Sequence, residues 1–150
     1  MHKQKGSVSV EFAFVAPMVI LLVLGFVETG NLFYSWLTTN KAAEAGARFA
    51  STGQGEEEGT RLALIQAEVA GHMDRLRGGA DEVVVSSWPM GSFSGEGAQG
   101  DAGDPCGMVE VEVAYAYHPV TPVLGDLLPE TITLTGSERS VNEPWYRCDE

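Results

Sequence analysis

The chain has 150 residues and a formal net charge of −12, from 9 Lys and Arg against 21 Asp and Glu. This acidic balance argues against nucleic-acid binding, which needs clustered Lys and Arg to neutralise phosphates. It favours solubility outside the cell instead. About 100 residues follow the apolar amino-terminal segment, which is enough for one small domain.

The amino-terminal segment predicts a membrane-spanning helix. Residues 12–27 carry no charge. At about 1.5 Å per residue, a helix from Phe12 to Leu37 measures about 39 Å, and it crosses a hydrocarbon core of about 30 Å with tilt. Lys3 and Lys5 precede the helix, so the positive-inside rule keeps that end in the cytoplasm and exports the rest of the chain.

Glu11 is a lone carboxylate at the start of this helix. Such a group costs about 2.5–3.5 kcal/mol at the helix centre and less toward the interface, so it needs a partner. Cleavage after Gly6 would supply one, because the new amino group of Ser7 would lie at the same membrane depth. A neighbouring copy shifted by about a turn could present that amine to Glu11. The pattern indicates a subunit that is cut after Gly6 and then stacked.

Two other readings of this segment stay open. Small-residue sites for signal peptidase occur between Ala43 and Ala47, and cleavage there would release a soluble exported protein, even an enzyme. Alternatively, the helix remains uncut and anchors an extracytoplasmic binding module, with Glu11 as an interfacial charge.

The following residues predict an α+β domain, a short helix and then a small antiparallel sheet. The Ala-rich residues 38–52 are expected to extend the membrane helix outward, with small side chains that permit close helix approach. A second helix is predicted from an N-cap at Thr60 to about Arg77. Its expected buried stripe is Leu62, Ile65, Val69, Met73 and Leu76.

Three strands are predicted by β-branched and alternating residues, at 82–88, 108–117 and 131–140. The segment 91–107 between the first two is rich in glycine and is expected to be an exposed loop. The connection before the third strand carries an apolar cluster that predicts a lid over the sheet, formed by Val123, Leu124, Leu127 and Leu128. The expected domain organisation is a basic leader at 1–6, a transmembrane and extended helix at 7–52 and an exported domain at 53–150.

Cys106 and Cys148 both fall in the exported part, where an even pair predicts one disulfide. Restriction of the unfolded chain would contribute about 3–4 kcal/mol. Two independent thiols are the alternative. A zinc site is not expected, because the chain has no CxxC motif and no nearby histidine pair.

The sequence offers little catalytic chemistry. Glu110 and Glu112 alternate along a predicted strand and indicate a solvated face. Glu96, Asp101 and Asp104 lack the spacing and terminal bidentate Glu of a calcium-binding EF-hand loop. We therefore predict no enzymatic activity, no cofactor and no metal site.

Several stretches of the chain resemble the TadE-like family, minor pilin-like proteins (pseudopilins) of the tight-adherence, or Flp, pilus system. The matching stretches are Gly6-Ser7-Val8-Ser9-Val10-Glu11-Phe12, Pro17 inside the apolar run, Gly25-Phe26-Val27-Glu28-Thr29-Gly30, the Ala-rich residues 42–50 and the closing Ser140-Val141-Asn142-Glu143-Pro144-Trp145. Val141 stands where the family usually has Arg, and Thr29 stands where an aromatic residue is common. Neither departure touches the expected processing site.

The resemblance implies that a prepilin peptidase cuts between Gly6 and Ser7, which leaves Glu11 as the fifth residue of the mature chain. It also implies an inner-membrane protein with a periplasmic or extracellular domain, acting in pilus assembly and adhesion. The implied partners are a second minor pilin-like subunit, the major pilin and the inner-membrane assembly platform. Glu28 is a second candidate carboxylate, and two readings of it remain open: pairing with a partner helix, or hydration near the outer interface. A pseudopilin of a type II secretion machine is a close rival, but the short leader and the closing Asn-Glu-Pro-Trp favour the tight-adherence system.

Overall fold

The computed structural model describes residues 5–121, 125 and 128–148. The described residues form an α+β fold in which a long helix precedes a shorter helix and an antiparallel sheet. The elements are α1 (Lys5–Ser51), α2 (Arg61–Met73), β1 (Glu82–Trp88), β2 (Ala98–Gln99), β3 (Met108–Tyr117) and β4 (Ile132–Val141). This architecture confirms the fold class that the sequence predicts.

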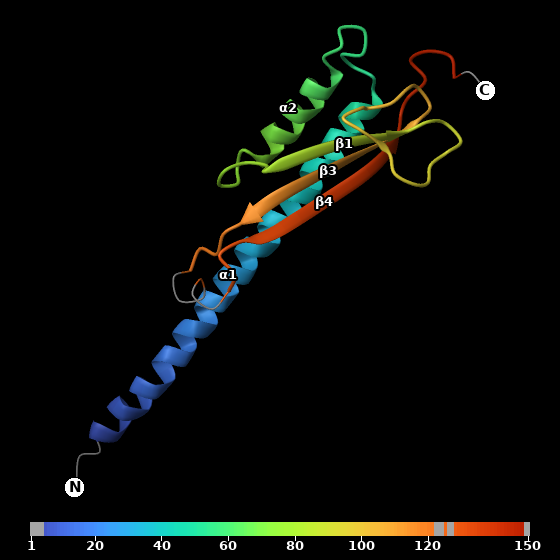
Figure 1. Cartoon of the computed structure of the whole chain (residues 1–150). Helices are drawn as coiled ribbons and strands as arrows, with labels where there is room; N and C mark the ends of the chain where they lie inside the picture. Colours follow the sequence, from blue (N-terminus) through green and yellow to red (C-terminus); the bar gives the residue numbers. More distant parts are fainter. Residues whose placement is uncertain (1–4, 122–124, 126–127, 149–150) are drawn as a thin grey trace.

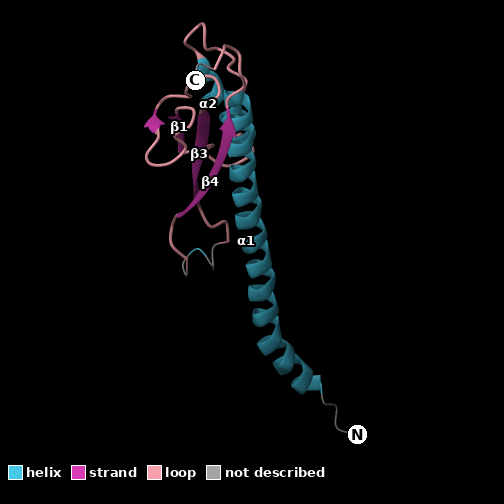
Figure 2. Cartoon of the chain, turned by 90° about the vertical axis from the view of Figure 1, so that its right-hand side faces the viewer, coloured by secondary structure: helices cyan, strands magenta, loops and turns pink. Residues whose placement is uncertain are grey.

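The long helix α1 has 47 residues and continues through Pro17. The sheet and α2 lie alongside its carboxyl-terminal half, and its amino-terminal half extends away from them (Figure 1, Figure 2). One half of α1 therefore packs in the domain, and the other half is an apolar helix that no other described element covers.

The sheet has strand order β2-β1-β3-β4, and each neighbouring pair is antiparallel. Val85 of β1 faces Val111 of β3, and Val113 of β3 faces Gly136 of β4. Since alternate residues share a face, the odd-numbered valines of β3 all point toward the helices. Val109, Val111 and Val113 are fully buried, as the alternating pattern predicts.

The core lies between the sheet, α2 and the Ala-rich part of α1. Small side chains on α1 allow the other two elements to approach it closely, and Gly46 is the extreme case. A Cβ atom at Gly46 would lie 2.6 Å from Cγ2 of Val69 on α2 and 3.1 Å from Cγ1 of Val111 on β3. The fully buried members are Ala42, Ala43, Ala47, Ala50, Ile65, Val69, Met73, Val109, Val111 and Val113.

The strand predictions are confirmed at 82–88 and 108–117, and the third strand begins and ends one residue later than expected. The short strand β2 lies inside the predicted Gly-rich loop and pairs with β1. Of the predicted lid, Val123, Leu124 and Leu127 lie outside the described residues, and Leu128 is exposed.

The second helix is shorter than predicted, because it ends at Met73 and not near Arg77. Thr60 occupies the N-cap position, but its side chain forms no capping hydrogen bond. The backbone N–H groups of Thr60 and Arg61 instead donate to the carbonyl oxygen of Gly55, at 2.9 and 3.1 Å. The turn before α2 thus supplies an acceptor for Arg61, whose N–H is one of the four donors at the start of the helix without a partner inside it.

Candidate assembly helix and its attachment to the domain

The amino-terminal half of α1 is an exposed apolar surface. From Val8 to Val27 the side chains are exposed or half-buried, and Phe12 and Phe14 have exposed fractions of 71% and 76%. These 20 residues span about 30 Å at about 1.5 Å per residue, which equals the thickness of a hydrocarbon core. By length and composition α1 is a candidate membrane span.

Glu11 lies on this exposed surface between Val10 and Phe12. It is the single charged residue between Val8 and Val27. Gly6 and Ser7, the predicted processing site, belong to the first turns of α1. Within the described part of the chain, Glu11 takes part in no hydrogen bond or ion pair.

Glu28 marks the place where the domain begins to cover α1. It is 5% exposed, whereas its neighbours Val27 and Thr29 are exposed. The Tyr117 hydroxyl donates to Oε1 at 2.5 Å. The Thr121 backbone N–H and hydroxyl both donate to Oε2, at 2.9 and 2.7 Å.

The backbone N–H of Val120 completes this set, at 3.1 Å from Oε1 and 3.2 Å from Oε2 of Glu28. Both predicted readings of Glu28, pairing with a partner helix and hydration, differ from this arrangement. The sheet's own β3 and the residues after it satisfy the carboxylate. Sequence spacing gave no signal for the contact, because the partners are 89 to 93 residues away.

The donors around Glu28 favour its ionised form, since a carboxylate that accepts several hydrogen bonds is stabilised in that form. The same contact stabilises the protonated form of its partner, the Tyr117 phenol. Burial, followed by the hydrogen bond to Glu28 and its charge, raises the pKa of the Tyr117 hydroxyl well above its ordinary value. Tyr117 is therefore a donor to Glu28 at any physiological pH.

Arg61 fixes the opposite end of the domain, and the sequence analysis did not single it out. The side chain is 4% exposed, and its guanidinium lies over the Trp145 ring at 4.6 Å. It donates to the carbonyl oxygens of Ala50 and Gly103, at 2.8 and 2.6 Å, and to Oδ1 of Asn142 at 3.1 Å. An available signal was the spacing of four, since Arg61 precedes Ile65, Val69 and Met73 on one helix face.

Asn142 explains the closing Asn-Glu-Pro-Trp stretch structurally. It is 2% exposed, and its side-chain amide donates to the carbonyl oxygens of Ala102, Gly103 and Asp104. The next residue, Glu143, donates its backbone N–H to the carbonyl oxygen of Ser51 at the end of α1. The closing stretch therefore joins the carboxyl terminus to α1 and to the loop after β2.

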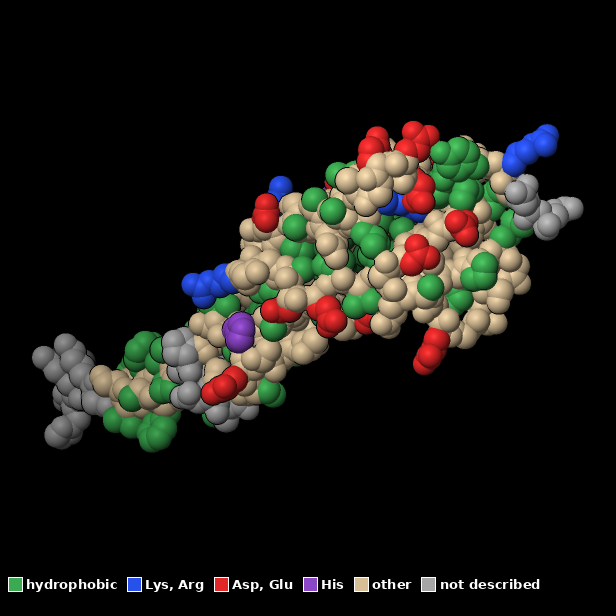
Figure 3. Space-filling view, turned by 45° about the horizontal axis from the view of Figure 1, so that its top comes forward, with side chains coloured by type: hydrophobic (Ala, Val, Ile, Leu, Met, Phe, Trp, Pro, Cys, Tyr) green, Lys and Arg blue, Asp and Glu red, His purple; other side chains and the backbone are tan. Residues whose placement is uncertain are grey.

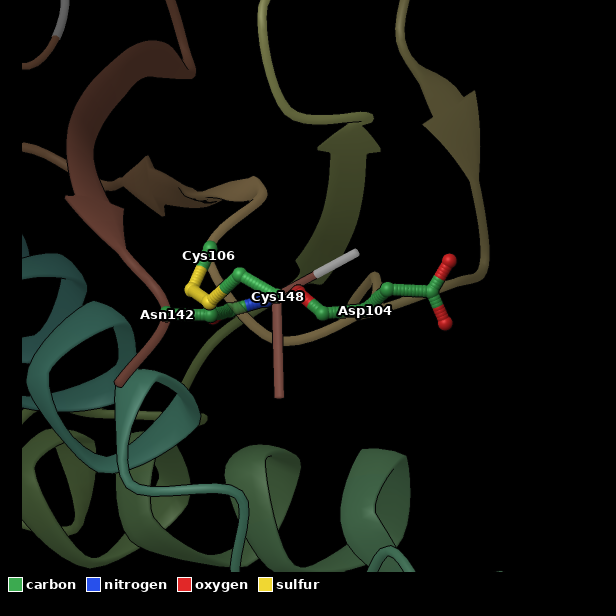
Figure 4. Close-up of a disulfide and its surroundings, with 4 residues drawn as sticks. All are labelled: Asp104, Cys106, Asn142 and Cys148. Atoms are coloured by element: carbon green, nitrogen blue, oxygen red, sulfur yellow. Dashed lines mark hydrogen bonds between the residues drawn. A yellow bond between two sulfur atoms is a disulfide. The ribbon is translucent and has the colours of Figure 1, made fainter. Parts of the chain in front are cut away.

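Cys106 and Cys148 form a disulfide beside Asn142, with their Cα atoms 5.9 Å apart, as the cysteine pair predicts. Figure 4 shows the bridge close to Asn142, with the Asp104 carboxylate directed away from it. The Cys106 backbone N–H also donates to the carbonyl oxygen of Asn142. Disulfide, amide and guanidinium thus stabilise one end of the domain together.

Two of the acidic residues singled out in the sequence, Asp101 as a calcium candidate and Glu110 on a solvated strand face, have partners within the chain. Asp101 accepts hydrogen bonds from the Ser87 hydroxyl and from the backbone N–H of Gly103. Glu110 forms an ion pair with Arg139 at 3.0 Å. Among the described residues, no group of three or more His, Cys, Asp or Glu side chains is arranged to hold a metal ion.

The amino-terminal part of the chain matches a known family. The model described as "TadE-like protein" matches residues 6–48, which include the candidate processing site, Glu11 and Glu28. This confirms the resemblance drawn from the sequence and relates the protein to the tight-adherence pilus system. No curated protein and no solved structure matches the chain.

Proposed function

We propose that the protein is a minor pilin-like subunit (pseudopilin) for assembly of a tight-adherence type IV pilus, processed by a prepilin peptidase after Gly6. The observation that carries this proposal is the exposed apolar part of α1 from Val8 to Val27, whose single charge is Glu11. Such a carboxylate is costly in a bilayer without a partner. The amine created at Ser7 of an adjacent subunit supplies that partner.

The packing of α1 supports a subunit that keeps its helix. Ala43 and Ala47 are fully buried in the core, and Glu28 is bound by the residues after β3. Cleavage between Ala43 and Ala47 would remove from the domain a helix that forms part of its core. Release as a soluble exported protein therefore fits this fold poorly.

The proposal gives residues 1–6 to a cytoplasmic leader, residues 7–52 to the transmembrane and extended helix and residues 53–150 to a periplasmic or extracellular domain. The protein would lie in the inner membrane and would meet a second minor pilin-like subunit, the major pilin and the assembly platform. It would contribute to adhesion through the pilus. Nucleic acid is not among its proposed partners. No catalytic step, cofactor or metal belongs to the proposal.

The test is the amino-terminal sequence of the mature protein from membranes, with and without the host's prepilin peptidase. We expect a start at Ser7 that depends on the peptidase. Gly6→Val should prevent this cleavage. Gly25→Val is the matched control, since it adds the same side chain where a Cβ would meet nothing within 4 Å.

Other outcomes separate the alternatives. An intact Met1 in the presence of the peptidase would contradict processing and leave an uncut, signal-anchored extracytoplasmic binding module. A start near residue 46 would contradict the whole proposal. In that case Glu11 would be absent from the mature protein.

A further inference from the structure

Five basic side chains of this acidic chain line two adjoining grooves on the domain. The grooves run between α1 and the end of α2, with volumes of about 440 and 360 Å³. Their linings share Tyr34 and Arg75. The basic side chains that line them are Lys41, His72, Arg75, Arg77 and His118.

These linings include no Asp or Glu among the described residues. Elsewhere acidic side chains are spread over the visible face of the domain (Figure 3). Only seven Lys and Arg follow the leader in the whole sequence, and three of them line the grooves. The groove linings are therefore basic. The carboxylates beside them are already in contact with the domain: Glu44 with Lys41, Glu68 with His72, and Glu28 with Tyr117 and Val120.

Arg75 and Arg77 are the groups free to bind an anion. Both are exposed, and neither forms an ion pair within the described ranges. Lys41 and His72 already contact carboxylates, at 2.5 Å from Glu44 and 3.5 Å from Glu68. The Tyr115 hydroxyl donates to the carbonyl oxygen of Arg77 at 3.4 Å and holds its backbone against the sheet.

The position of the smaller groove along α1 indicates what it would meet. Asn31 and Ser35, which line the smaller groove, lie four and eight residues beyond Val27. At about 1.5 Å per residue these distances are about 6 and 12 Å past the end of the exposed apolar helix. The headgroup layer occupies about 5–8 Å on each side of the hydrocarbon core, so the groove opens at or just outside it.

The aromatic residues of α1 at this level agree with such a location. Phe33, Tyr34 and Trp36 have exposed fractions of 60%, 48% and 44%. Tyrosine and tryptophan are enriched at the membrane–water interface. Arginine is suited to phosphate because its planar guanidinium can form two parallel hydrogen bonds.

From this geometry we infer that the smaller groove, lined by Arg75 and Arg77, binds the headgroup of an anionic phospholipid in the leaflet next to the domain. The inference rests on the part of the proposed function in which α1 spans the membrane. It requires neither cleavage after Gly6 nor assembly into a pilus. Lipid binding at this place would set the depth and tilt of the domain on the membrane surface.

The test uses the full chain in detergent micelles, with phosphatidylglycerol and phosphatidylcholine of identical acyl chains added in equal amounts. Native mass spectrometry counts the lipids that each variant retains. We expect the wild-type chain to retain phosphatidylglycerol preferentially. R75Q/R77Q should reduce that preference about 5-fold for each arginine removed.

The matched control is R48Q/R147Q, which removes two exposed arginines that lie outside both grooves. It should retain the wild-type preference. An unchanged preference in R75Q/R77Q would overturn the inference, and so would an equal loss in R48Q/R147Q. Loss of a co-purifying pilin-like subunit with lipid retention unchanged would also overturn it, because the smaller groove would then be a protein interface.

Two further measurements guard against misfolding and separate the proposals. In the wild-type chain, raising the salt concentration should weaken the phosphatidylglycerol preference, and a preference insensitive to salt would overturn the inference. The amino terminus of each sample is sequenced in parallel. Selective lipid retention by a chain that still begins at Met1 would support the smaller groove as a lipid site while contradicting the proposed processing.

Discussion

The Tyr117 hydroxyl at the end of β3 donates a hydrogen bond of 2.5 Å to Oε1 of Glu28 on α1. The two residues are 89 positions apart in the chain. From Val8 to Val27 the helix side chains are exposed or half-buried, and from Glu28 onward one face of the helix belongs to the domain. This hydrogen bond therefore lies at the boundary between the candidate membrane span and the folded domain.

Glu28→Gln should loosen this attachment. The amide would place an N–H₂ group among four donors, those of Tyr117, Val120 and Thr121, and at least one buried donor would lose its acceptor. We expect a loss of about 1–3 kcal/mol, which lowers Tm by several degrees. Thermal unfolding of the full chain in detergent, followed by near-UV circular dichroism, measures it.

The control for Glu28→Gln is Glu44→Gln. Glu44 lies on the same helix, but its ion pair with Lys41 is more than half exposed. Exposed pairs of this kind contribute about 0–1 kcal/mol. Equal losses of stability in the two variants would show that burial of the Glu28 carboxylate has no special weight.

Alkaline pH should destabilise the domain through Tyr117. Its pKa in the folded protein is raised above the ordinary value of 10.0, by burial first and then by Glu28. The unfolded chain therefore releases this proton at lower pH than the folded chain does, and stability falls as pH rises above about 10. Tyr117→Phe should make the decline of Tm above pH 10 less steep.

The Tm of Tyr117→Phe should still fall somewhat as the pH rises above 10. Burial and the nearby Asp81 also raise the pKa of Tyr115, which remains in the variant. Paired melting curves at successive pH values, for wild type and variant, give the two slopes. Identical slopes would contradict the role assigned to the Tyr117 hydroxyl.

The regular elements could be predicted because their signals are local. Alternation along residues 108–117 and the spacing of Ile65, Val69 and Met73 follow directly from strand and helix geometry. The amino-terminal span and the place of Glu11 also needed no tertiary information. By contrast, the partners of Glu28 and Arg61 are set by contacts between segments far apart in sequence, for which periodicity carries no information.

The closing Asn-Glu-Pro-Trp stretch also makes contacts that the sequence pattern does not predict. Asn142 to Trp145 were recognised as a pattern, but the pattern did not reveal that Asn142 binds the loop at 102–104 and that Trp145 lies under Arg61. The end of α2 also differs from the predicted one near Arg77, because the helix ends at Met73. The stretch up to Gly78 and Gly79 is instead a turn after Met73.

Two glycines at contacts of α1, Gly136 on β4 and Gly46 on α1 itself, should differ in their tolerance of alanine. At Gly136 of β4, a Cβ would lie 2.9 Å from the backbone N and Cα of Asn40 on α1. Backbone atoms cannot rotate away, so Gly136→Ala should cost about 1–3 kcal/mol. At Gly46 the obstructing atom is a Val69 methyl group, and some repacking should lessen the cost.

Gly71→Ala is the control for both substitutions. Gly71 lies within α2, and a Cβ there would meet nothing within 4 Å. Alanine has the higher helix propensity, so this variant should gain up to about 1 kcal/mol. Urea unfolding of the three variants gives the order, and Gly136→Ala matching Gly71→Ala would contradict the close approach of β4 to α1.

Arg61→Lys should destabilise the domain strongly although it keeps the charge. A lysine cannot reproduce the forked donation to Ala50, Gly103 and Asn142 or the stacking on Trp145. Leaving these buried acceptors without donors should cost about 3 kcal/mol or more. The same change at the exposed Arg48 should cost under about 0.5 kcal/mol, and comparable losses at both sites would contradict the structural role of Arg61.

Glu11→Gln should separate assembly from stability. Glu11 lies on the exposed half of α1 and contacts no described part of the domain, so thermal unfolding of the domain should change by less than about 0.5 kcal/mol. The variant can no longer attract the Ser7 amine of a neighbour, and its co-purification with pilin-like partners and the number of surface pili should fall. Glu28→Gln is expected to give the reverse order of effects, with a clear loss of stability from a carboxylate that the domain itself binds. Normal piliation with Glu11→Gln would contradict the assembly role of this carboxylate, whereas a lower Tm would place Glu11 in a contact within the chain.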